Sequence, residues 1–237
     1  MQRILSTMRR AIQDYNMISA GDKIAVGVSG GKDSLVLLAA LAAFRRFSEV
    51  PFEVMGITIS MGFDGMDYGE VEEFCKKIGV EYVVKKTDIA EILFDVRKEK
   101  NPCSLCSRMR RGALNDLAKE NGCNKVALGH NNEDVIETFF LSLFYEGRLN
   151  SFSPFTYLSR REIAVIRPLI YAAESDIRGY ARRAKLPIVK NLCPMDGVSK
   201  RQDMKDFINE KAKADRHFKA RMMNAIQTGL DDWKIGG

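Results

Sequence analysis

The chain has 237 residues, of which 46% are hydrophobic, and it carries 37 Lys and Arg against 31 Asp and Glu, a formal net charge of +6. This size supports one full α/β core with a small extension and excludes a second large domain. No apolar run approaches the ~20 residues of a membrane span, and the N-terminal segment lacks the apolar stretch of a secretory signal. We therefore expect a cytoplasmic protein with no membrane association, whose charge is compatible with a polyanionic partner.

The first elements in chain order are a helix, a strand, a glycine loop and a second helix. Residues 1–20 are expected to form the N-terminal helix. Residues 23–28 (KIAVGV) are short, β-branched and apolar, which is typical of a strand buried on both faces. Residues 33–47 have the length and the Leu and Ala content of a helix. The stretch SGGKDS (29–34) joins the strand to this helix.

Strands and helices alternate along the rest of the chain. Strands are expected at residues 52–59, 81–86 and 125–130, and helices at residues 68–80, 107–122 and 133–147. This alternation predicts an α/β fold with a parallel, doubly wound, Rossmann-like sheet over residues 21–190, and a small helical C-terminal extension over residues 191–237. Ligands of such sheets lie beyond the carboxyl ends of the strands. Both SGGKDS and GHNNED (129–134) fall at such ends.

The glycine loop indicates a phosphate site, because a helix N-terminus presents free N–H groups and a positive dipole end. Two common phosphate motifs do not fit it. Val26 stands where a Walker loop needs glycine, and Ser29 stands where the dinucleotide fingerprint needs glycine. What remains, SGGKDS, resembles the PP-loop of ATP pyrophosphatases, which bind the pyrophosphate end of ATP and release it after attack on the α-phosphate. A plain glycine turn is the alternative.

The cysteines form the second informative set: Cys75, Cys103, Cys106, Cys123 and Cys193. An odd number argues against a disulfide framework. Cys103 and Cys106 form a Cys-x-x-Cys at a predicted helix start beside arginines, where thiolates are favoured. Cys193 is the third candidate ligand, and three thiolates can hold three irons of a 4Fe-4S cluster while the fourth iron stays open. Zinc, a redox dithiol and inert cysteines remain alternatives.

Two segments are basic and are candidates for binding nucleic acid. One contains Arg108, Arg110 and Arg111, and the other begins with Lys200 and Arg201. A solvated helix face with interspersed acids explains the second segment equally well. The charge by itself therefore does not establish an RNA partner.

Five stretches, taken in order, resemble the tRNA 2-thiocytidine synthetase family of tRNA-thiolating PP-loop ATPases. They are DYNMISAGDKIAVGVSGGKDS, NPCSLCSRMRRGAL, ALGHNNEDVIETFFLSLFYEGRL, RPLIYAAESDI and NLCPMDGVSKR. The chain departs from well-known proteobacterial members in its shorter C-terminal region and in the residues after the third cysteine. It also lacks the additional Cys-x-x-Cys modules of the two-zinc thiolases. The resemblance implies a PP-loop fold, ATP, Mg²⁺, a 4Fe-4S cluster and adenylation of a tRNA base carbonyl before sulfur replaces its oxygen.

The resemblance and the chemistry assign roles around the glycine loop. The pyrophosphate is expected to lie against Ser29, Gly30, Gly31, Asp33 and Ser34, while Lys32 neutralises charge on the leaving group. Asp33 is alternatively a magnesium ligand. The adenine edge is expected at Ile59 and Ser60, with Gly129 and His130 facing the same crevice. His130 and Asp134 would orient ATP or its metal; the alternatives are a buried histidine and a first-turn acid favoured by the helix dipole.

The remaining site assignments concern the metal and the RNA. The cluster ligands are expected to be Cys103, Cys106 and Cys193. The RNA-binding residues are expected to be Arg108, Arg110, Arg111, Lys200 and Arg201, because they flank the cysteines in sequence and can contact phosphates.

These features predict an ATP-dependent tRNA sulfurtransferase that produces AMP and pyrophosphate. Its partners would be tRNA and a sulfur donor, either a cysteine desulfurase or free sulfide, and a homodimer is compatible with the sequence. An unpaired nucleotide is the target that needs the least free energy to reach the site, because the base must leave its stack. An anticodon-loop cytidine is the first choice and a uridine the second. Another PP-loop ligase or amidotransferase, and a nucleotide-binding metal sensor without turnover, are the competing functions.

Overall fold

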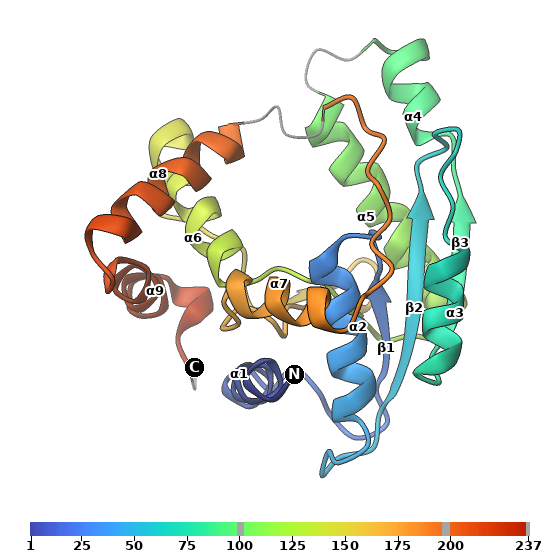
Figure 1. The fold of residues 1–237 in the computed structure, drawn as a ribbon, viewed down its shortest axis with the longest axis horizontal. Helices are drawn as coiled ribbons and strands as arrows, with labels where there is room; N and C mark the ends of the chain where they lie inside the picture. The colour runs from blue at the N-terminus through green and yellow to red at the C-terminus, as the bar shows by residue number, and fades with distance from the viewer. Residues whose placement is uncertain (99–101, 196–199, 236–237) are drawn as a thin grey trace.

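The chain forms a six-stranded sheet with the strand order β3-β2-β1-β4-β6-β5. Strands β1, β2 and β3 of this sheet lie side by side in Figure 1. The computed structural model describes residues 1–98, 102–195 and 200–235. The strands are β1 (Lys23–Gly27), β2 (Glu53–Ser60), β3 (Glu81–Lys86), β4 (Lys125–Ala127), β5 (Phe155–Leu158) and β6 (Ile163–Ile166). Neighbouring strands run parallel, except that β5 runs antiparallel to β6. The predicted doubly wound sheet is confirmed, with an antiparallel strand added at one edge.

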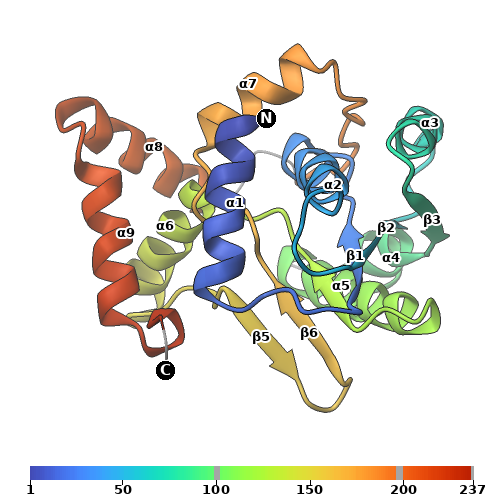
Figure 2. The same cartoon turned by 90° about the horizontal axis from the view of Figure 1, so that it is seen from below.

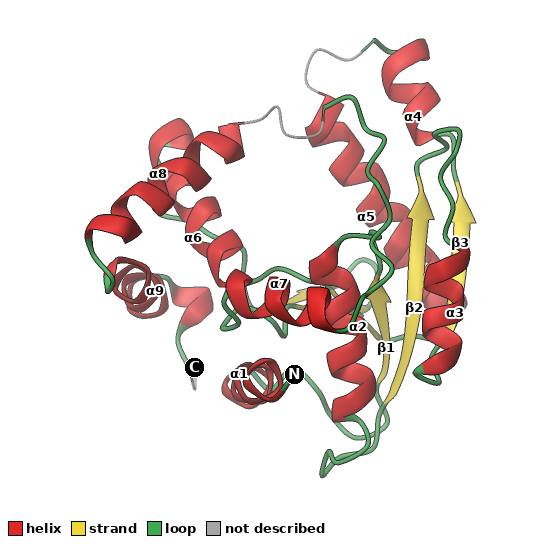
Figure 3. Ribbon diagram, in the orientation of Figure 1, coloured by secondary structure: helices red, strands yellow, loops and turns green. Residues whose placement is uncertain are grey.

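Helices cover both faces of the sheet (Figures 2 and 3). They are α1 (Gln2–Asp14), α2 (Lys32–Phe44), α3 (Gly69–Lys77), α4 (Ile89–Glu91), α5 (Pro102–Glu120), α6 (Asn132–Leu141), α7 (Glu174–Arg183), α8 (Lys200–Ala214) and α9 (Phe218–Gly229). The short turns η1 (Ile92–Val96), η2 (Ser142–Glu146) and η3 (Asp231–Trp233) complete the set. Apolar residues of α1, α2 and α3 pack on one face, and those of α4 and α5 pack on the other.

The C-terminal helices share a core with the N-terminal helix. Side chains of α1, α7, α8 and α9 belong to one continuous buried cluster, which also contains the fully buried Trp233. The Tyr15 hydroxyl donates to the Trp233 carbonyl at 3.1 Å and accepts a hydrogen bond from the Tyr171 hydroxyl at 3.1 Å. Gln227 of α9 donates to Tyr171 at 2.9 Å. The two ends of the chain are therefore packed together.

Several boundaries differ from the sequence prediction for local reasons. Helix α2 begins at Lys32, with Gly31 as its N-cap. The strand expected at 125–130 ends at Ala127, because Gly129 then passes against the start of α2. The helix expected at 133–147 is α6 followed by the π-helical turn η2, and it stops at Gly147 in the left-handed conformation, with φ of 64°. The β5–β6 hairpin and α7 had no counterpart in the prediction.

Among the described residues, no helix combines the length and the apolar character needed to cross a membrane.

Candidate active site

The glycine loop lies between β1 and α2, at the carboxyl edge of the sheet. Gly30 adopts a φ of +84°, and a Cβ at this position would lie 2.8 Å from the Cβ of Val189. The Val189 N–H donates to the Gly30 carbonyl at 3.0 Å, which holds the loop against the segment before Cys193. Only glycine combines this backbone conformation with this close contact.

Two serine hydroxyls brace the loop from inside. Ser34 donates to the Gly31 carbonyl at 2.9 Å, and its oxygen accepts the Ser29 N–H at 3.1 Å. The Ser29 hydroxyl oxygen lies 3.2 Å from that of Ser34 and accepts the Gly31 N–H at 3.3 Å. The first N–H groups of a helix have no partner within it, so α2 presents such donors immediately beside this braced loop. The predicted Ser29, Gly30, Gly31 and Ser34 thus form one structural unit.

Lys32 is held between two carboxylates. Its ammonium nitrogen lies 2.8 Å from Asp33 Oδ2 and 3.0 Å from Glu174 Oε1. Burial alone would lower the pKa of Lys32, but the hydrogen bonds and charges of Asp33 and Glu174 outweigh it and raise the pKa above its usual range. Lys32 is therefore a cation at neutral pH, as a phosphate ligand must be.

The segment after β4 brings a second helix N-terminus to the loop. Asn131 caps α6: its Oδ1 accepts the Asp134 N–H at 3.2 Å, while its own N–H donates to Asp134 Oδ2 at 2.9 Å. The Asn131 amide also donates to Asp33 Oδ1 at 3.0 Å. A Cβ on Gly129 would lie 3.0 Å from the Asp33 carbonyl carbon, so the segment after β4 passes closely against the start of α2. Gly129 and Asp134 are thus joined to the glycine loop.

Asp134 is a half-buried carboxyl with a raised pKa. Burial is the main cause, and the nearby Asp33 carboxylate adds to it, while hydrogen bonding to the Asn131 N–H and the Arg201 charge oppose it. Arg201 lies 3.4 Å from Asp134 Oδ1 and 3.6 Å from Glu137 Oε2. Arg201 therefore faces acids of α6 in this structure, although the sequence suggested an RNA-binding role.

His130 is a neutral histidine packed on an aromatic ring. Its imidazole stacks on Phe152, with ring centroids 4.5 Å apart. Burial, reinforced by Arg167, Arg201 and Arg111, lowers the pKa of His130 to about 3. Its buried Nδ1 has no hydrogen-bond partner among the described residues. A neutral ring in this position cannot supply positive charge to a phosphate.

Ile59 and Ser60 end β2, next to β1 in the sheet, and both are buried. The Ser60 carbonyl accepts two hydrogen bonds, from the Thr87 N–H at 3.1 Å and from the Thr87 hydroxyl at 2.7 Å. These two residues therefore reach the same edge as the glycine loop, but the Ser60 carbonyl is already engaged.

The candidate cysteines surround the same end of the sheet. Cys103 and Cys106 lie in the first turns of α5, and Cys103 is exposed while Cys106 and Cys193 are half-buried. The Cys106 thiol lies 3.8 Å from the Met61 sulfur, directly after β2. Burial raises the pKa of the Cys106 thiol and outweighs the charge of Arg110, which lowers it. The nearby Cys193 and Cys103 raise this pKa further. The prediction that Cys106 favours the thiolate form is thus wrong for this residue taken alone. The three thiols nevertheless lie near one another.

Cys75 and Cys123 differ clearly from these three. Both are buried in apolar clusters, and burial raises the pKa of each thiol to about 11. They are packing residues.

The donor set near α5 consists of three soft thiols, Cys103, Cys106 and Cys193, which is a ligand set that iron–sulfur clusters use. Among the residues described, no three His, Cys, Asp or Glu side chains are placed as ligands of one metal ion.

The predicted RNA-binding residues divide into two groups. Arg108 and Arg111 are exposed on α5, while Arg110 is half-buried beside Cys106 and lowers the pKa of that thiol. Lys200 is exposed, and its ammonium lies 4.2 Å from the centre of the Tyr145 ring. Arg108, Arg111 and Lys200 are therefore exposed, whereas Arg110 is hydrogen-bonded to Cys106 and Arg201 is paired with acids of α6.

The sequence did not predict two acidic residues near the site, Glu174 on α7 and Glu137 on α6. Glu174 begins α7 and binds Lys32, and Glu137 of α6 has a pKa raised to about 7, chiefly by burial and then by Asp134. Glu174 lies within the RPLIYAAESDI stretch and Glu137 within GHNNEDVIET, yet neither stands in a pattern that reveals its partner.

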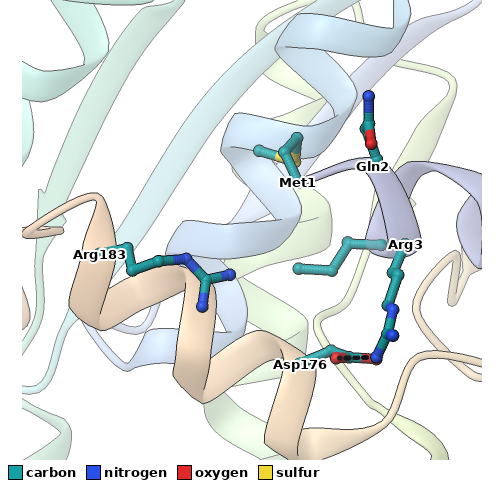
Figure 4. A pocket seen from close by; sticks show the side chains of 6 residues that line it. Met1, Gln2, Arg3, Asp176 and Arg183 are labelled. Atoms are coloured by element: carbon teal, nitrogen blue, oxygen red, sulfur yellow. Dashed lines mark ion pairs between the residues drawn. The ribbon is translucent and has the colours of Figure 1, made fainter.

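A hollow of about 410 Å³ lies away from this edge, between α1 and α7 (Figure 4). Arg3 and Asp176 form an ion pair of 3.7 Å across it, and its lining includes Met1 and Arg183 but no residue of the glycine loop. We assign it no part in nucleotide binding.

The sequence matches the PP-loop domain family over residues 3–210. It is 40% identical over 210 residues to the tRNA-cytidine(32) 2-sulfurtransferase of Ralstonia pickettii strain 12J, covering 88% of this chain and 67% of that protein. It is 39% identical over 228 residues to the protein of the same name from Geotalea daltonii, covering 95% of this chain and 90% of the relative. The chain belongs to the tRNA-cytidine 2-sulfurtransferase family of PP-loop proteins.

A solved structure shows the same fold as this family member. The U34-tRNA thiolase NcsA from Methanococcus maripaludis, solved with its 4Fe-4S cluster, superposes with a TM-score of 0.77 at 24% identity, covering 95% of this chain and 78% of that one. The α/β fold predicted from the PP-loop resemblance is thereby confirmed.

Proposed function

We propose that this chain is an ATP-dependent tRNA sulfurtransferase, which replaces the carbonyl oxygen of a tRNA base with sulfur. One juxtaposition carries the proposal: the glycine loop with Lys32 and the group of three cysteines stand at the same carboxyl edge of the sheet. Base activation and sulfur delivery have to occur at one atom, so their sites must adjoin. The names of the relatives support cytidine as the base.

ATP would bind with its pyrophosphate end against the glycine loop. The N–H groups at the start of α2 and the Ser29 hydroxyl are donors for the phosphate oxygens, and Ser34, whose hydroxyl donates to the Gly31 carbonyl, would hold the loop in shape. Lys32 would offset the negative charge that grows on the leaving pyrophosphate. Ile59 and Ser60 would border the adenosine, and Gly129 would allow the segment after β4 to pass closely against the start of α2.

Magnesium fits beside the loop, because two carboxylates there destabilise each other. Asp33 raises the pKa of Asp134, and both carboxylates are held by Asn131. A divalent cation would relieve this repulsion, and when bound it would neutralise charge on the phosphates. We assign Asp33 and Asp134 to this role. Neutral His130 would shape the crevice rather than bind the metal-bound phosphates.

Cys103, Cys106 and Cys193 would hold a 4Fe-4S cluster. When bound, such a cluster leaves one iron without a protein ligand, where sulfur for the reaction can be held. Arg110, which favours the Cys106 thiolate, would help that cysteine to ionise for binding.

The reaction is a substitution that consumes one ATP. The base carbonyl oxygen attacks the α-phosphate, and the bond to pyrophosphate breaks. A hydrosulfide equivalent then adds to the activated carbon, and AMP leaves with the original oxygen. No net oxidation of the base occurs, so the donor must supply sulfur at the sulfide level. A cysteine desulfurase with a reductant, or free sulfide, meets this requirement.

The RNA would approach over the exposed Arg108 and Arg111, and then over Arg110 and Lys200. An unpaired anticodon-loop cytidine is the proposed target, because it leaves its stack at low cost. Reduced thiols and a tRNA substrate both favour a cytoplasmic setting. We include a homodimer in the proposal as the oligomeric state that a measurement should test.

The deciding experiment supplies anaerobically reconstituted protein with ATP, sulfide and unmodified tRNA. The expected products are AMP, pyrophosphate and a tRNA nucleoside that carries sulfur in place of oxygen, identified by mass spectrometry. Formation of ADP and phosphate, or of a nucleoside that gained nitrogen instead of sulfur, would contradict the proposal.

A further inference from the structure

Glu174 is a junction at which a lysine of the C-terminal helices meets the glycine-loop lysine. Its Oε1 lies 3.0 Å from the ammonium of Lys32 and 3.1 Å from that of Lys205, which α8 carries. The Arg178 guanidinium, one turn along α7, lies 3.3 Å from the same oxygen. Three cations from three helices thus share one carboxylate oxygen.

Glu174 is fixed in place from several sides. Its side chain is 11% exposed, and its backbone N–H donates to Glu133 Oε2 at 2.8 Å. Lys219 of α9 donates to the other oxygen of Glu133 at 2.9 Å. Burial alone would raise the pKa of Glu174, but Lys32 and Lys205 lower it to about 2. The carboxylate is therefore charged and well anchored.

Two lysines from separate helices share one carboxylate oxygen at this junction. Lys32 and Lys205 both bind Glu174 Oε1, so their ammonium groups lie close together. Lys32 also begins α2, whose positive dipole end adds to the attraction for an anion. An anion that binds at the glycine loop contacts Lys32 first. Lys205 is linked to Lys32 through Glu174 Oε1, which both ammonium groups contact.

We propose that Lys205 is a second cation for the pyrophosphate of ATP, positioned beside the glycine loop by Glu174. Its side chain is 35% exposed, so its ammonium keeps the freedom to turn from Glu174 to a phosphate oxygen. Helix α8 would then be drawn toward the loop when nucleotide binds. This inference rests on the proposed function, because it takes the glycine loop as the ATP site.

The test is the equilibrium affinity of the cluster-loaded protein for magnesium pyrophosphate and, separately, for AMP, measured by calorimetry. Lys205→Ala is expected to weaken pyrophosphate binding about tenfold, the scale of one charge-assisted hydrogen bond, and to leave AMP binding unchanged. Lys205→Arg should restore most of the affinity. Lys211→Ala removes an exposed lysine from the same helix and should match the wild type.

Two results would overturn the inference. One is a Lys205→Ala protein that binds pyrophosphate like the wild type, and the other is an equal loss of pyrophosphate and AMP affinity, which would mark a purely structural contact. Lys32→Ala separates the two levels of the argument. If Lys32→Ala loses pyrophosphate affinity and Lys205→Ala does not, only this inference is wrong; if neither loses it, the proposed ATP site is wrong.

The positioning role of Glu174 has its own readout. If Lys205 acts through Glu174, Glu174→Gln and Lys205→Ala should give a combined loss of pyrophosphate affinity smaller than the sum of the two single losses. Strictly additive losses would show that Lys205 reaches the phosphates without Glu174.

Discussion

The Asn131 side chain joins two helix N-termini: its amide nitrogen donates to Asp33 Oδ1 on α2 at 3.0 Å, while its oxygen accepts the Asp134 N–H on α6 at 3.2 Å. The donor and the acceptor of one amide group are both used. Replacement by alanine removes an N-cap, so Asn131→Ala should lose about 1 kcal/mol of unfolding free energy and also reduce AMP production.

Asn131→Asp separates these two effects. It keeps an acceptor for the Asp134 N–H but places a carboxylate beside Asp33, so stability should largely return while AMP production stays low. Urea denaturation and an AMP assay measure the two quantities. Turnover at the wild-type level in Asn131→Asp would show that the Asp33 contact is unimportant.

Lys32→Ala should lower the rate of AMP and pyrophosphate formation by roughly a hundredfold or more, because the cation nearest the loop is lost. The far-ultraviolet circular dichroism should not change, since Lys32 lies at a helix start. Lys76→Ala is a suitable control, because Lys76 pairs only with the neighbouring Glu72 on α3 among the ion pairs of the described chain. An active Lys32→Ala enzyme would disprove the assigned role.

The cysteines should separate into two classes on anaerobic reconstitution with iron and sulfide. Alanine at Cys103, Cys106 or Cys193 should abolish the visible absorption of the cluster. Cys75→Ala and Cys123→Ala should keep it and instead lose roughly 1 kcal/mol of stability, since both thiols fill buried space. Uptake of one zinc and no iron by the wild type would refute the cluster assignment.

The raised pKa of Glu137 predicts that the contribution of this residue to stability falls as pH rises. Burial, followed by Asp134, raises the pKa of Glu137 from an ordinary 4.5 to about 7. Between these values the folded chain keeps a proton that the unfolded chain releases, so the contribution of Glu137 to stability falls as pH rises. Glu137→Gln should therefore gain more stability over the wild type above pH ~7 than near pH ~5. Thermal melts of both proteins at the two pH values test this, and an equal difference at both would contradict it.

Binding of tRNA should weaken steeply with salt, because phosphate contacts release counterions. Arg110→Ala and Lys200→Ala should each flatten the logarithmic salt slope by about 1. Lys76→Ala serves again as the control, because it lies on α3. Wild-type slopes in both variants would mean that the RNA docks elsewhere. Arg201→Ala is a different case, because Arg201 is paired with Asp134 and Glu137.

Local patterns in the sequence were sufficient for the sheet and the loop, but not for what packs over them. Alternation of strands and helices predicted β1 to β4, whereas β5 and β6 form an antiparallel hairpin with no helix between them, which breaks that alternation. The loop residues were predicted because a strand and a helix flank them. Glu174 escaped notice because its partners, Lys32 and Lys205, come from distant segments that meet only in the folded chain.

Burial also changed the chemistry that sequence suggested. A cysteine at a helix start beside arginines is typically acidic, but desolvation dominates at Cys106. Arg201 seemed available for RNA, yet α6 supplies two acids beside it. Desolvation and partner choice are properties of the tertiary structure, and no residue spacing reports them.

The contact between Tyr15 and Trp233 has a consequence for synthesis on the ribosome. The helix made first leaves the exit tunnel long before the tryptophan that packs beside it, with ring centroids 6.0 Å apart in the finished fold. Until Trp233 has left the ribosome, the apolar face of α1, with Ile4, Met8 and Ile12, lacks the C-terminal part of its cover. Nascent chains paused before Trp233 should therefore depend on chaperones, and chains extended past Trp233 should hold that helix in a protease-resistant form.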